Sequence, residues 1–462
     1  MEESSETTQA PDDSPSLDRK AGAWAWMVIL LAPLLMIGAD RLIPAAETEA
    51  TTQQDTSLLA LLQVQARMVM VLAISKPEEA HRQLGELERY AHSDETAAAL
   101  ALTHGFIGLE NGGREAADLL LAKRAETDGA DKAFLEEVRQ VVLHGVDAEG
   151  RARLHQRVGW FAKLAGTPTD PAKAPEGDQI RASAMIQTLL IGLAGFGVVA
   201  AIFAGAALLL LAEMRRNAGK LELAFDRARL PAGIFLEVFA IFLLGMAVGH
   251  VAGWLIHWSL QPVISIGAMI GALRWPKRHG YTWRETRRAL GLHRGKGIFR
   301  EIGAGALGYL TVLPMAVMGL AMTFALIAIM QRLATNDAAG AGEVMAEPVS
   351  HPAVGWMLGN WEVKVLVFLL AAVLAPLIEE TFFRGAFFRS LRSRFGFVAS
   401  ALLNGVIFAA LHPQGWMAIP ALTMMGFGFA SLREWRDSLI APMTAHAINN
   451  GLLIGGLALV LS

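Results

Sequence analysis

Long apolar runs alternate with polar stretches along this chain of 462 residues. A helix needs about 20 apolar residues to cross the hydrocarbon core of a bilayer, and several runs reach that length. We predict nine spans, of which 260–274 is the shortest: 22–39, 184–212, 232–258, 260–274, 303–330, 362–381, 398–413, 415–432 and 438–461. The predicted fold class is an all-α, polytopic helical membrane protein.

Two stretches outside the predicted spans are polar in different ways. Residues 1–20 are acidic and show no apolar periodicity, which is typical of a disordered tail. In residues 47–180, apolar residues recur at helical spacing, as at Leu84 and Leu87. We predict a soluble helical domain there, ending in the proline-containing linker 165–180. A sensor, a docking module and a spacer all fit this domain, and its partner is unknown.

The composition supports the membrane interpretation. Hydrophobic residues make up 53% of the chain and charged residues 18%, and the mean hydropathy is +0.40. Soluble domains are about a quarter charged. This composition excludes a soluble enzyme and a disordered chain. Because the chain has no cysteine, it has no disulfide, no thiolate nucleophile and no cysteine-based zinc site. A net charge of -3 gives no reason to expect nucleic-acid binding.

The positions of the charges predict the topology. Lys and Arg concentrate in 213–230, 274–300 and 384–394, each beside a span. By contrast, 333–361 has no Lys or Arg but has the acidic residues Asp337, Glu343 and Glu347. Basic loops face the cytoplasm in membrane proteins. We therefore predict an integral, multi-pass protein with a cytoplasmic N-terminus, with 47–180 and 333–361 outside the cytoplasm.

Ionisable residues at membrane depth are costly, so they point to function. One group ends the span 362–381 with the adjacent carboxylates Glu379 and Glu380. Neighbours on a helix point to different sides, and Arg384 lies four residues after Glu380, the spacing of an ion pair. We predict that Glu380 pairs with Arg384 and that Glu379 remains for proton transfer. An ordinary ion-paired helix end is the alternative.

Two further groups follow in the next spans. His412 closes an apolar helix before Pro413, and His446 lies four residues before Asn450 on one face of the last span. An interfacial histidine and hydrogen bonds between helices explain these residues without chemistry. Together, however, the groups supply the parts of a hydrolytic centre. A Glu and a His can activate water, with or without a metal, and a second His and an Asn can stabilise an oxyanion.

The stretches EETFFRG, FAALH and HAINN resemble the three motifs of the CPBP family (CAAX protease and bacteriocin-processing, or Abi) of intramembrane proteases. The family patterns are EExxxR, FxxxH and HxxxN/B, in this order, and the resemblance covers roughly 280–461. The apolar runs and the basic residues predict spans over 184–274 and a basic cytoplasmic segment over 275–302. The resemblance implies a protease core over 303–461. The implied activity is endopeptidase hydrolysis of a membrane-associated or CAAX-like substrate by an activated water.

The resemblance also implies a role for each motif residue. The implied roles are water activation by Glu379 and His412, oxyanion or metal binding by His446 and Asn450, and structural support by Glu380 and Arg384. The motifs do not decide whether a divalent metal such as zinc is bound, and Glu379, His412 and His446 are the candidate ligands. The sequence has no HExxH motif, which excludes an ordinary zincin helix. The expected partners are membrane lipid and a peptide or protein substrate.

Two other functions remain as alternatives. A non-catalytic membrane scaffold or bacteriocin-immunity protein could retain the same motifs for packing. A transporter could use them as a proton relay, although no inverted repeat is evident.

Overall fold

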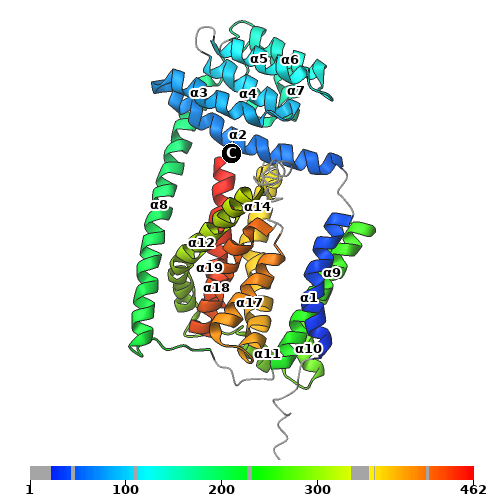
Figure 1. Ribbon diagram of the computed structural model, residues 1–462, viewed down its shortest axis with the longest axis vertical. Coiled ribbons are helices and arrows are strands. Elements are labelled where there is room, and N and C mark those ends of the chain that lie inside the picture. The colour runs from blue at the N-terminus through cyan, green and yellow to red at the C-terminus, as the bar shows by residue number, and fades with distance from the viewer. Residues whose placement is uncertain are drawn as a thin grey trace, which may run out of the picture. The chain divides into compact units, whose positions relative to one another are not determined.

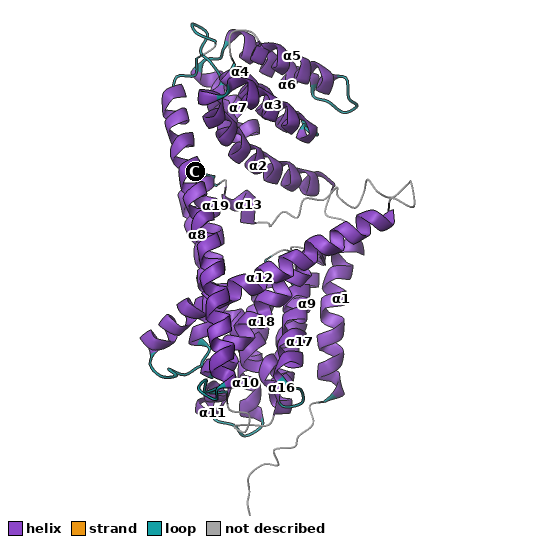
Figure 2. Cartoon of the chain, turned by 60° about the vertical axis from the view of Figure 1, so that its left-hand side comes forward, coloured by secondary structure: helices purple, strands orange, loops and turns teal. Residues whose placement is uncertain are grey.

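The computed structural model describes residues 22–42, 47–108, 112–171, 173–225, 232–257, 259–334, 353–357, 359–412 and 416–461. The predicted acidic tail, 1–20, lies outside the described residues. Throughout the described ranges the regular elements are helices, and the only β contact is an isolated bridge between Thr167 and Asp170 (Figures 1 and 2). The prediction of an all-α fold is confirmed.

The chain divides into two compact units that alternate along the sequence. The first, here called the membrane unit, consists of Met1–Ile43, Ala204–Asn336 and Val373–Asn449. The second, here called the bundle unit, consists of Pro44–Phe203, Asp337–Ala372 and Asn450–Ser462. Each unit has a buried apolar cluster of its own.

The helices up to the middle of the chain are α1 (Ala23–Leu42), α2 (Glu47–Ser75), α3 (Pro77–Leu87), α4 (Asp94–Ile107), α5 (Gly112–Ala125), α6 (Lys132–His144), α7 (Ala148–Val158), α8 (Gly177–Asn217), α9 (Ala232–Leu255), α10 (Leu260–Arg278), α11 (Trp283–Leu290) and α12 (Ile298–Ala334). Short 3-10 turns lie at Glu88–Tyr90, Gly159–Leu164 and Trp416–Ala418. The start of α8 falls inside the segment 165–180, so part of the predicted linker is helical.

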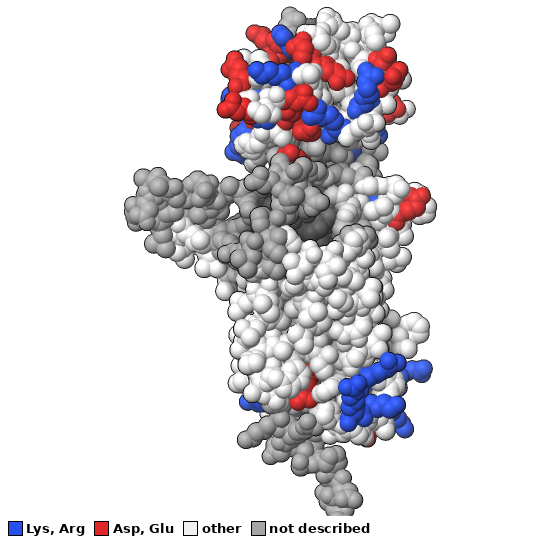
Figure 3. Space-filling model, turned by 90° about the vertical axis from the view of Figure 1, so that its right-hand side faces the viewer, with Lys and Arg blue, Asp and Glu red and all other residues white. Residues whose placement is uncertain are grey.

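Six of the described helices are long and apolar enough to cross a membrane: Asp55–Ser75, Gly177–Asn217, Ala232–Leu255, Ile298–Met330, Trp361–Arg392 and Ile440–Val460. Ala23–Met36 and Phe397–Ala410 are shorter apolar helices. Their outward side chains are mostly apolar, and Figure 3 shows a broad surface almost free of charge, with Lys and Arg gathered at one end. The chain is a polytopic membrane protein, and the predicted number of nine spans remains a prediction.

One helical segment is longer than its predicted span, 362–381. It runs from α14 (Trp361–Leu369) through α15 (Ala375–Glu380) to α16 (Phe388–Arg392). Two π-helical stretches, Leu370–Leu374 and Thr381–Phe387, join these pieces. A π turn accommodates an extra residue, which shifts the direction of the side chains that follow and leaves backbone groups to be satisfied elsewhere.

Three helices follow: α17 (Phe397–Ala410), α18 (Ile419–Arg436) and α19 (Ile440–Val460). The part of α19 from Asn450 onward belongs to the bundle unit. The short helix α13 (Ala353–Met357) precedes α14. Both α12 and α17 pack against α18. A side chain at Gly405 would lie 2.5 Å from the Thr423 carbonyl oxygen, so this glycine permits the close approach of α17 and α18.

In the bundle unit, α4 lies at the centre of the apolar cluster, and most of its residues are buried. This apolar cluster also explains why α2 is apolar. Leu62, Ala66 and Val69 of that helix are buried in the same cluster as residues of α3 to α7. Thus α2 meets the length and hydropathy of a span while supplying one side of a helical core.

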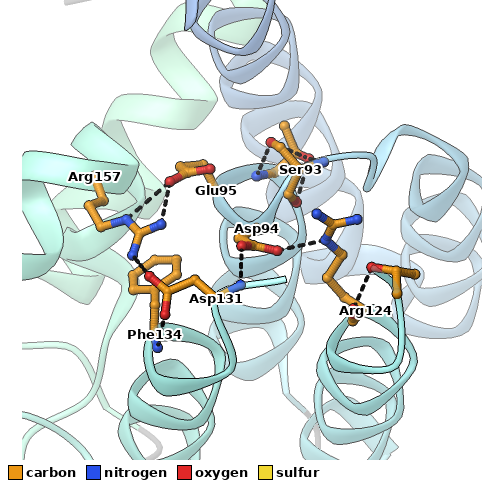
Figure 4. A network of polar contacts seen from close by, with 9 residues as sticks. Ser93, Asp94, Glu95, Arg124, Asp131, Phe134 and Arg157 are labelled. Atoms are coloured by element: carbon orange, nitrogen blue, oxygen red, sulfur yellow. Dashed lines mark hydrogen bonds and ion pairs between the residues drawn. The ribbon is translucent and has the colours of Figure 1, made fainter. Parts of the chain in front are cut away.

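The bundle helices begin at polar residues that cap them. The side chains of Ser93, Asp131 and Asp147 accept hydrogen bonds from backbone N–H groups in the first turns of α4, α6 and α7. Figure 4 shows polar contacts that link the start of α4 to the start of α6 and to the last turns of α5 and α7. Arg157 donates to Glu95 and to Asp131, while Asp94 accepts from Arg124 and from the Asp131 N–H. One cap residue, Asp131, therefore also links the start of α6 to α4 and to α7.

Candidate active site

His446 lies on α19, is 2% exposed and meets both glutamates of the EE pair. Its Nδ1 is 2.9 Å from Glu380 Oε1, and its Nε2 is 3.7 Å from Glu379 Oε2. The ring also stacks on Phe429, with 4.9 Å between ring centroids. One imidazole therefore has a carboxylate beside each nitrogen, one within hydrogen-bonding distance and one further away.

The two carboxylates differ in their surroundings, although they are neighbours in sequence. The Glu380 side chain is fully buried, whereas that of Glu379 is 27% exposed. Within the described residues, Glu379 Oε2 is a buried atom without a hydrogen-bond partner. A carboxylate oxygen that faces a histidine, is not yet engaged and belongs to a partly accessible residue is suited to accept a proton.

The predicted pair of Glu380 and Arg384 is present. Arg384 Nη1 donates to Glu380 Oε1 at 2.9 Å, and neither side chain is exposed. Arg384 also lies over the rings of Phe408 and Phe429, with its Cζ 4.5 and 5.3 Å from the ring centroids. An ion buried this deeply requires such compensation. Glu380 thus binds Arg384 and His446 with the same oxygen.

Gly426 on α18 is a site residue that the sequence analysis missed. Its carbonyl accepts a hydrogen bond from Arg384 Nη2 at 3.2 Å. A side chain on Gly426 would lie 2.9 Å from Gly405 Cα and 3.2 Å from Arg384 Nη2. The alternation of glycine and phenylalanine at 426–429 is the signal that could have drawn attention to it, because small residues permit close contacts between membrane helices.

His412 lies just beyond α17, with its ring against Phe408 at 4.2 Å between centroids. Its Nδ1 is 2.7 Å from the Phe408 carbonyl oxygen, so Nδ1 carries the hydrogen and Nε2 keeps a lone pair. His446 packs edge-on against the same Phe408 ring, at 5.9 Å between centroids. Arg384 Cζ lies 4.5 Å from the centroid of that ring. The three motifs therefore converge around Phe408.

Two asparagines donate to backbone carbonyls in the π-helical stretches. In the membrane unit, Asn404 Nδ2 donates to the Phe383 carbonyl at 2.8 Å, and the side chain is buried. In the bundle unit, Asn450 Nδ2 donates to the Ala371 carbonyl at 2.9 Å. A π turn changes the pairing of nearby carbonyls, and an amide side chain can satisfy them. The sequence analysis assigned no role to Asn404 and did not anticipate this contact of Asn450.

The candidate metal ligands are not grouped as a metal-binding set in the described part of the chain. Among the described residues, no group of three or more His, Cys, Asp or Glu side chains is arranged to hold a metal ion, and Glu379, His412 and His446 therefore do not make such a set. His446 uses Nδ1 to contact Glu380, and His412 uses Nδ1 to contact a backbone carbonyl. We derive the chemistry from these side chains alone.

The C-terminal part of the chain matches a known protease family. Residues 360–452, which contain all six motif residues, match the family described as "Type II CAAX prenyl endopeptidase Rce1-like". This match confirms the resemblance that the three motifs indicated.

Two relatives match part of the chain at low identity. The "Putative membrane peptidase YdiL" of Bacillus subtilis (strain 168) is 28% identical over 89 residues, which are 19% of this chain and 36% of the relative. The "Uncharacterized 24.3 kDa protein" of Escherichia coli is 33% identical over 97 residues, 20% of this chain and 45% of the relative. The chain thus covers less than half the length of either relative. No solved structure matches the chain.

Proposed function

We propose that this chain, whose C-terminal part belongs to the Rce1-like family of type II CAAX prenyl endopeptidases, is an intramembrane endopeptidase that uses Glu379 to activate water. The observation that carries the proposal is the position of His446 between the carboxylates of Glu379 and Glu380. A membrane-buried imidazole held in this way has no evident purpose in packing alone.

The buried residues fix the orientation of the imidazole. Glu380, held by Arg384, accepts a hydrogen bond from His446 Nδ1–H, which leaves Nε2 directed towards Glu379. A carboxylate that orients a histidine through Nδ1–H is a recurring arrangement in hydrolases. Glu380 and Arg384 therefore act as positioning residues.

Hydrolysis then needs a base, a path for the proton and a group that stabilises negative charge. Glu379 takes a proton from water as the water oxygen bonds to the peptide carbonyl carbon. His412, with the lone pair of Nε2 available, shares in orienting the water. His446 Nε2 lies beside Glu379 and is placed to donate to the oxyanion. Glu379 returns its proton to the amide nitrogen as the C–N bond breaks, which yields a carboxylic acid and an amine.

Asn450 has a less direct place in this scheme. Its amide donates to the Ala371 carbonyl, so a role at the oxyanion requires exchange of that bond. We propose a membrane-associated peptide as the substrate class, because the chain is a membrane protein and the family name refers to CAAX prenyl substrates.

The test uses the full chain in proteoliposomes. Two peptides that differ only in a farnesyl group on a CAAX cysteine are incubated in water enriched in ¹⁸O. We expect cleavage with one ¹⁸O atom in the new carboxylate, and Glu379→Gln should reduce turnover by about 10²–10⁴-fold, the range for loss of a general base. Glu362→Gln is the matched control, because Glu362 begins the same helical segment and is exposed.

The outcomes separate the proposal from the scaffold alternative. Full activity of Glu379→Gln would exclude this residue as the base. If neither peptide is cleaved, new N-termini in membranes of cells expressing wild-type protein or Glu379→Gln are compared by mass spectrometry. The absence of any difference there would favour a scaffold.

We also propose a cytoplasmic N-terminus, supported by the basic residues between the predicted spans. Reporter fusions at Thr286 and Gly129 test it. A cytoplasmic signal is expected at Thr286 and an external one at Gly129, and a cytoplasmic signal at Gly129 would contradict the scheme.

A further inference from the structure

A basic pocket lies in the membrane unit, apart from the three motifs. Its volume is about 460 Å³, and it is formed by α11, the turn that follows this helix, the end of α18 and the segment near Ala224. Its charged or titratable lining residues are Arg284, Arg287, Arg288, His293, Arg294, Lys296, Arg436 and Asp437. Six of these eight are Arg or Lys, and one is acidic.

The acidic groups around the pocket are already engaged. Asp437 pairs with Arg433 at 2.8 Å, and Glu301 binds Arg436 through both carboxylate oxygens at 2.7 and 2.9 Å. The remaining five cations of the lining have no salt bridge to a described Asp or Glu: Arg284, Arg287, Arg288, Arg294 and Lys296. Over the described part of the chain, this cluster therefore has positive charge that its neighbours do not balance.

The turn after α11 adds an oriented donor to the pocket. The Gly295 N–H donates to His293 Nδ1 at 3.1 Å, so in the neutral imidazole the hydrogen is on Nε2. That Nε2 is buried, lies 3.6 Å from Asp437 Oδ2 and makes no hydrogen bond to a described group. Gly295 and Gly297 have φ angles of 53° and 122°, which permit this tight turn.

We propose that this pocket binds a phosphate-bearing anion. Several guanidinium groups around one cavity provide the planar, forked donors that phosphate oxygens accept, and His293 Nε2–H adds a further donor. The phosphate can belong to an anionic lipid headgroup, since basic pockets beside membrane helices bind such headgroups, or to a free phosphate compound.

The pocket is connected to the helix that carries His446. The Leu439 N–H donates to the Gly291 carbonyl at 2.9 Å, and Ser438 Oγ donates to the His293 carbonyl at 2.9 Å. These bonds fasten the turn after α11 to the start of α19. A ligand bound in the pocket therefore stabilises the folded protein and raises its melting temperature.

Binding is measured with the delipidated full chain in a neutral detergent. The probes are dioctanoyl-phosphatidylglycerol, dioctanoyl-phosphatidylcholine and inorganic pyrophosphate, and the readouts are Kd by native mass spectrometry and Tm. The test variant is Arg287→Gln/Arg288→Gln/Arg294→Gln. The matched control is Arg274→Gln/Lys277→Gln/Arg278→Gln, which removes the same charge from exposed positions at the end of α10. Arg294→Gln alone serves if the triple variant does not fold.

We expect the wild-type protein to bind phosphatidylglycerol or pyrophosphate more tightly than phosphatidylcholine. The triple variant should weaken that binding by about tenfold or more, with less than about threefold loss in the control. Binding of phosphatidylglycerol without pyrophosphate identifies a lipid site, and competition between the two identifies phosphate recognition itself. Equal binding of both lipids with no pyrophosphate binding would overturn the proposal, as would equal losses in the two triple variants.

Discussion

Two Glu–Arg pairs with the same helical spacing lie in opposite surroundings in the two units. In the bundle unit, Arg153 Nη1 is 3.4 Å from Glu149 Oε1, and the side chains are 61% and 86% exposed. In the membrane unit, Arg384 Nη1 is 2.9 Å from Glu380 Oε1, and both side chains are 0% exposed. The spacing permits each pair to form, whereas the surroundings determine what each contributes.

The difference extends to the construction of the units. The bundle unit has an apolar core, and ion pairs connect the ends of its helices. The membrane unit has apolar side chains on its outer faces and several ion pairs within it, including Arg392 with Glu434. Removing one partner of a buried pair leaves an uncompensated charge, while the partner of an exposed pair returns to water. Equivalent substitutions should therefore have very different effects.

The largest effect is expected for Arg384→Ala. The change leaves Glu380 buried without its cation, and breaking a buried pair costs about 3–5 kcal/mol. Without Arg384, Glu380 no longer holds the His446 ring in a fixed orientation, so turnover should fall together with stability. Thermal unfolding of the full chain in detergent measures the first effect, and peptide cleavage the second. An unchanged Tm would show that water reaches Glu380, contrary to its burial.

A buried histidine in the bundle unit gives the next effect. His104 on α4 is 2% exposed, and neither ring nitrogen has a hydrogen-bond partner among the described groups. Burial, with a smaller effect of His81, lowers the pKa of His104 to about 4. Glu88 Oε1 lies 3.4 Å from His104 Nε2. Burial raises the pKa of the Glu88 carboxyl, so burial disfavours the charged form of both partners.

The sign of the pH effect follows from this lowered pKa. Between the ordinary pKa of about 6.5 and the folded value, the unfolded state binds more protons, so stability falls as the pH falls. The bundle unit should lose up to about 3 kcal/mol between pH 6.5 and 4. Hydrogen exchange in α4, corrected for intrinsic exchange rates, measures this loss. His104→Gln should flatten the dependence, and a steep fall retained in that variant would assign the effect to other groups.

An intermediate effect is expected for Arg157→Ala. Arg157 donates to Glu95 and Asp131, lies over the Phe134 ring and is 35% exposed (Figure 4). A partly exposed network of this kind contributes about 1 kcal/mol. Hydrogen exchange at the start of α6 measures it, and high salt should reduce the difference between wild type and variant. A loss as large as that of Arg384→Ala would remove the contrast between the units.

The sequence predicted those features that depend on local spacing. The apolar runs predicted the membrane helices, and the four-residue spacing of Glu380 and Arg384 predicted their pair. The π-helical stretches are not encoded by any spacing, and neither the contact of Glu380 with His446 nor that of Asn450 with Ala371 was predicted. Gly426 was missed because its role depends on the approach of a distant helix. Hydropathy also does not separate α2 from a span, since a bundle core is as apolar as a bilayer.

The smallest effect should come from Arg153→Ala, the counterpart of Arg384→Ala with the same spacing. Exposed pairs four residues apart on a helix contribute about 0.3–0.5 kcal/mol, because both charges are hydrated before and after the change. Arg153 is also 3.9 Å from Glu137, a second exposed acid, and this contact adds little for the same reason. Hydrogen exchange in α7 should therefore change by less than about threefold, which corresponds to such an energy. If Arg153→Ala destabilised the bundle unit by more than about 2 kcal/mol, exposure would not be what separates the two pairs, and the expected cost of Arg384→Ala would lose its physical basis.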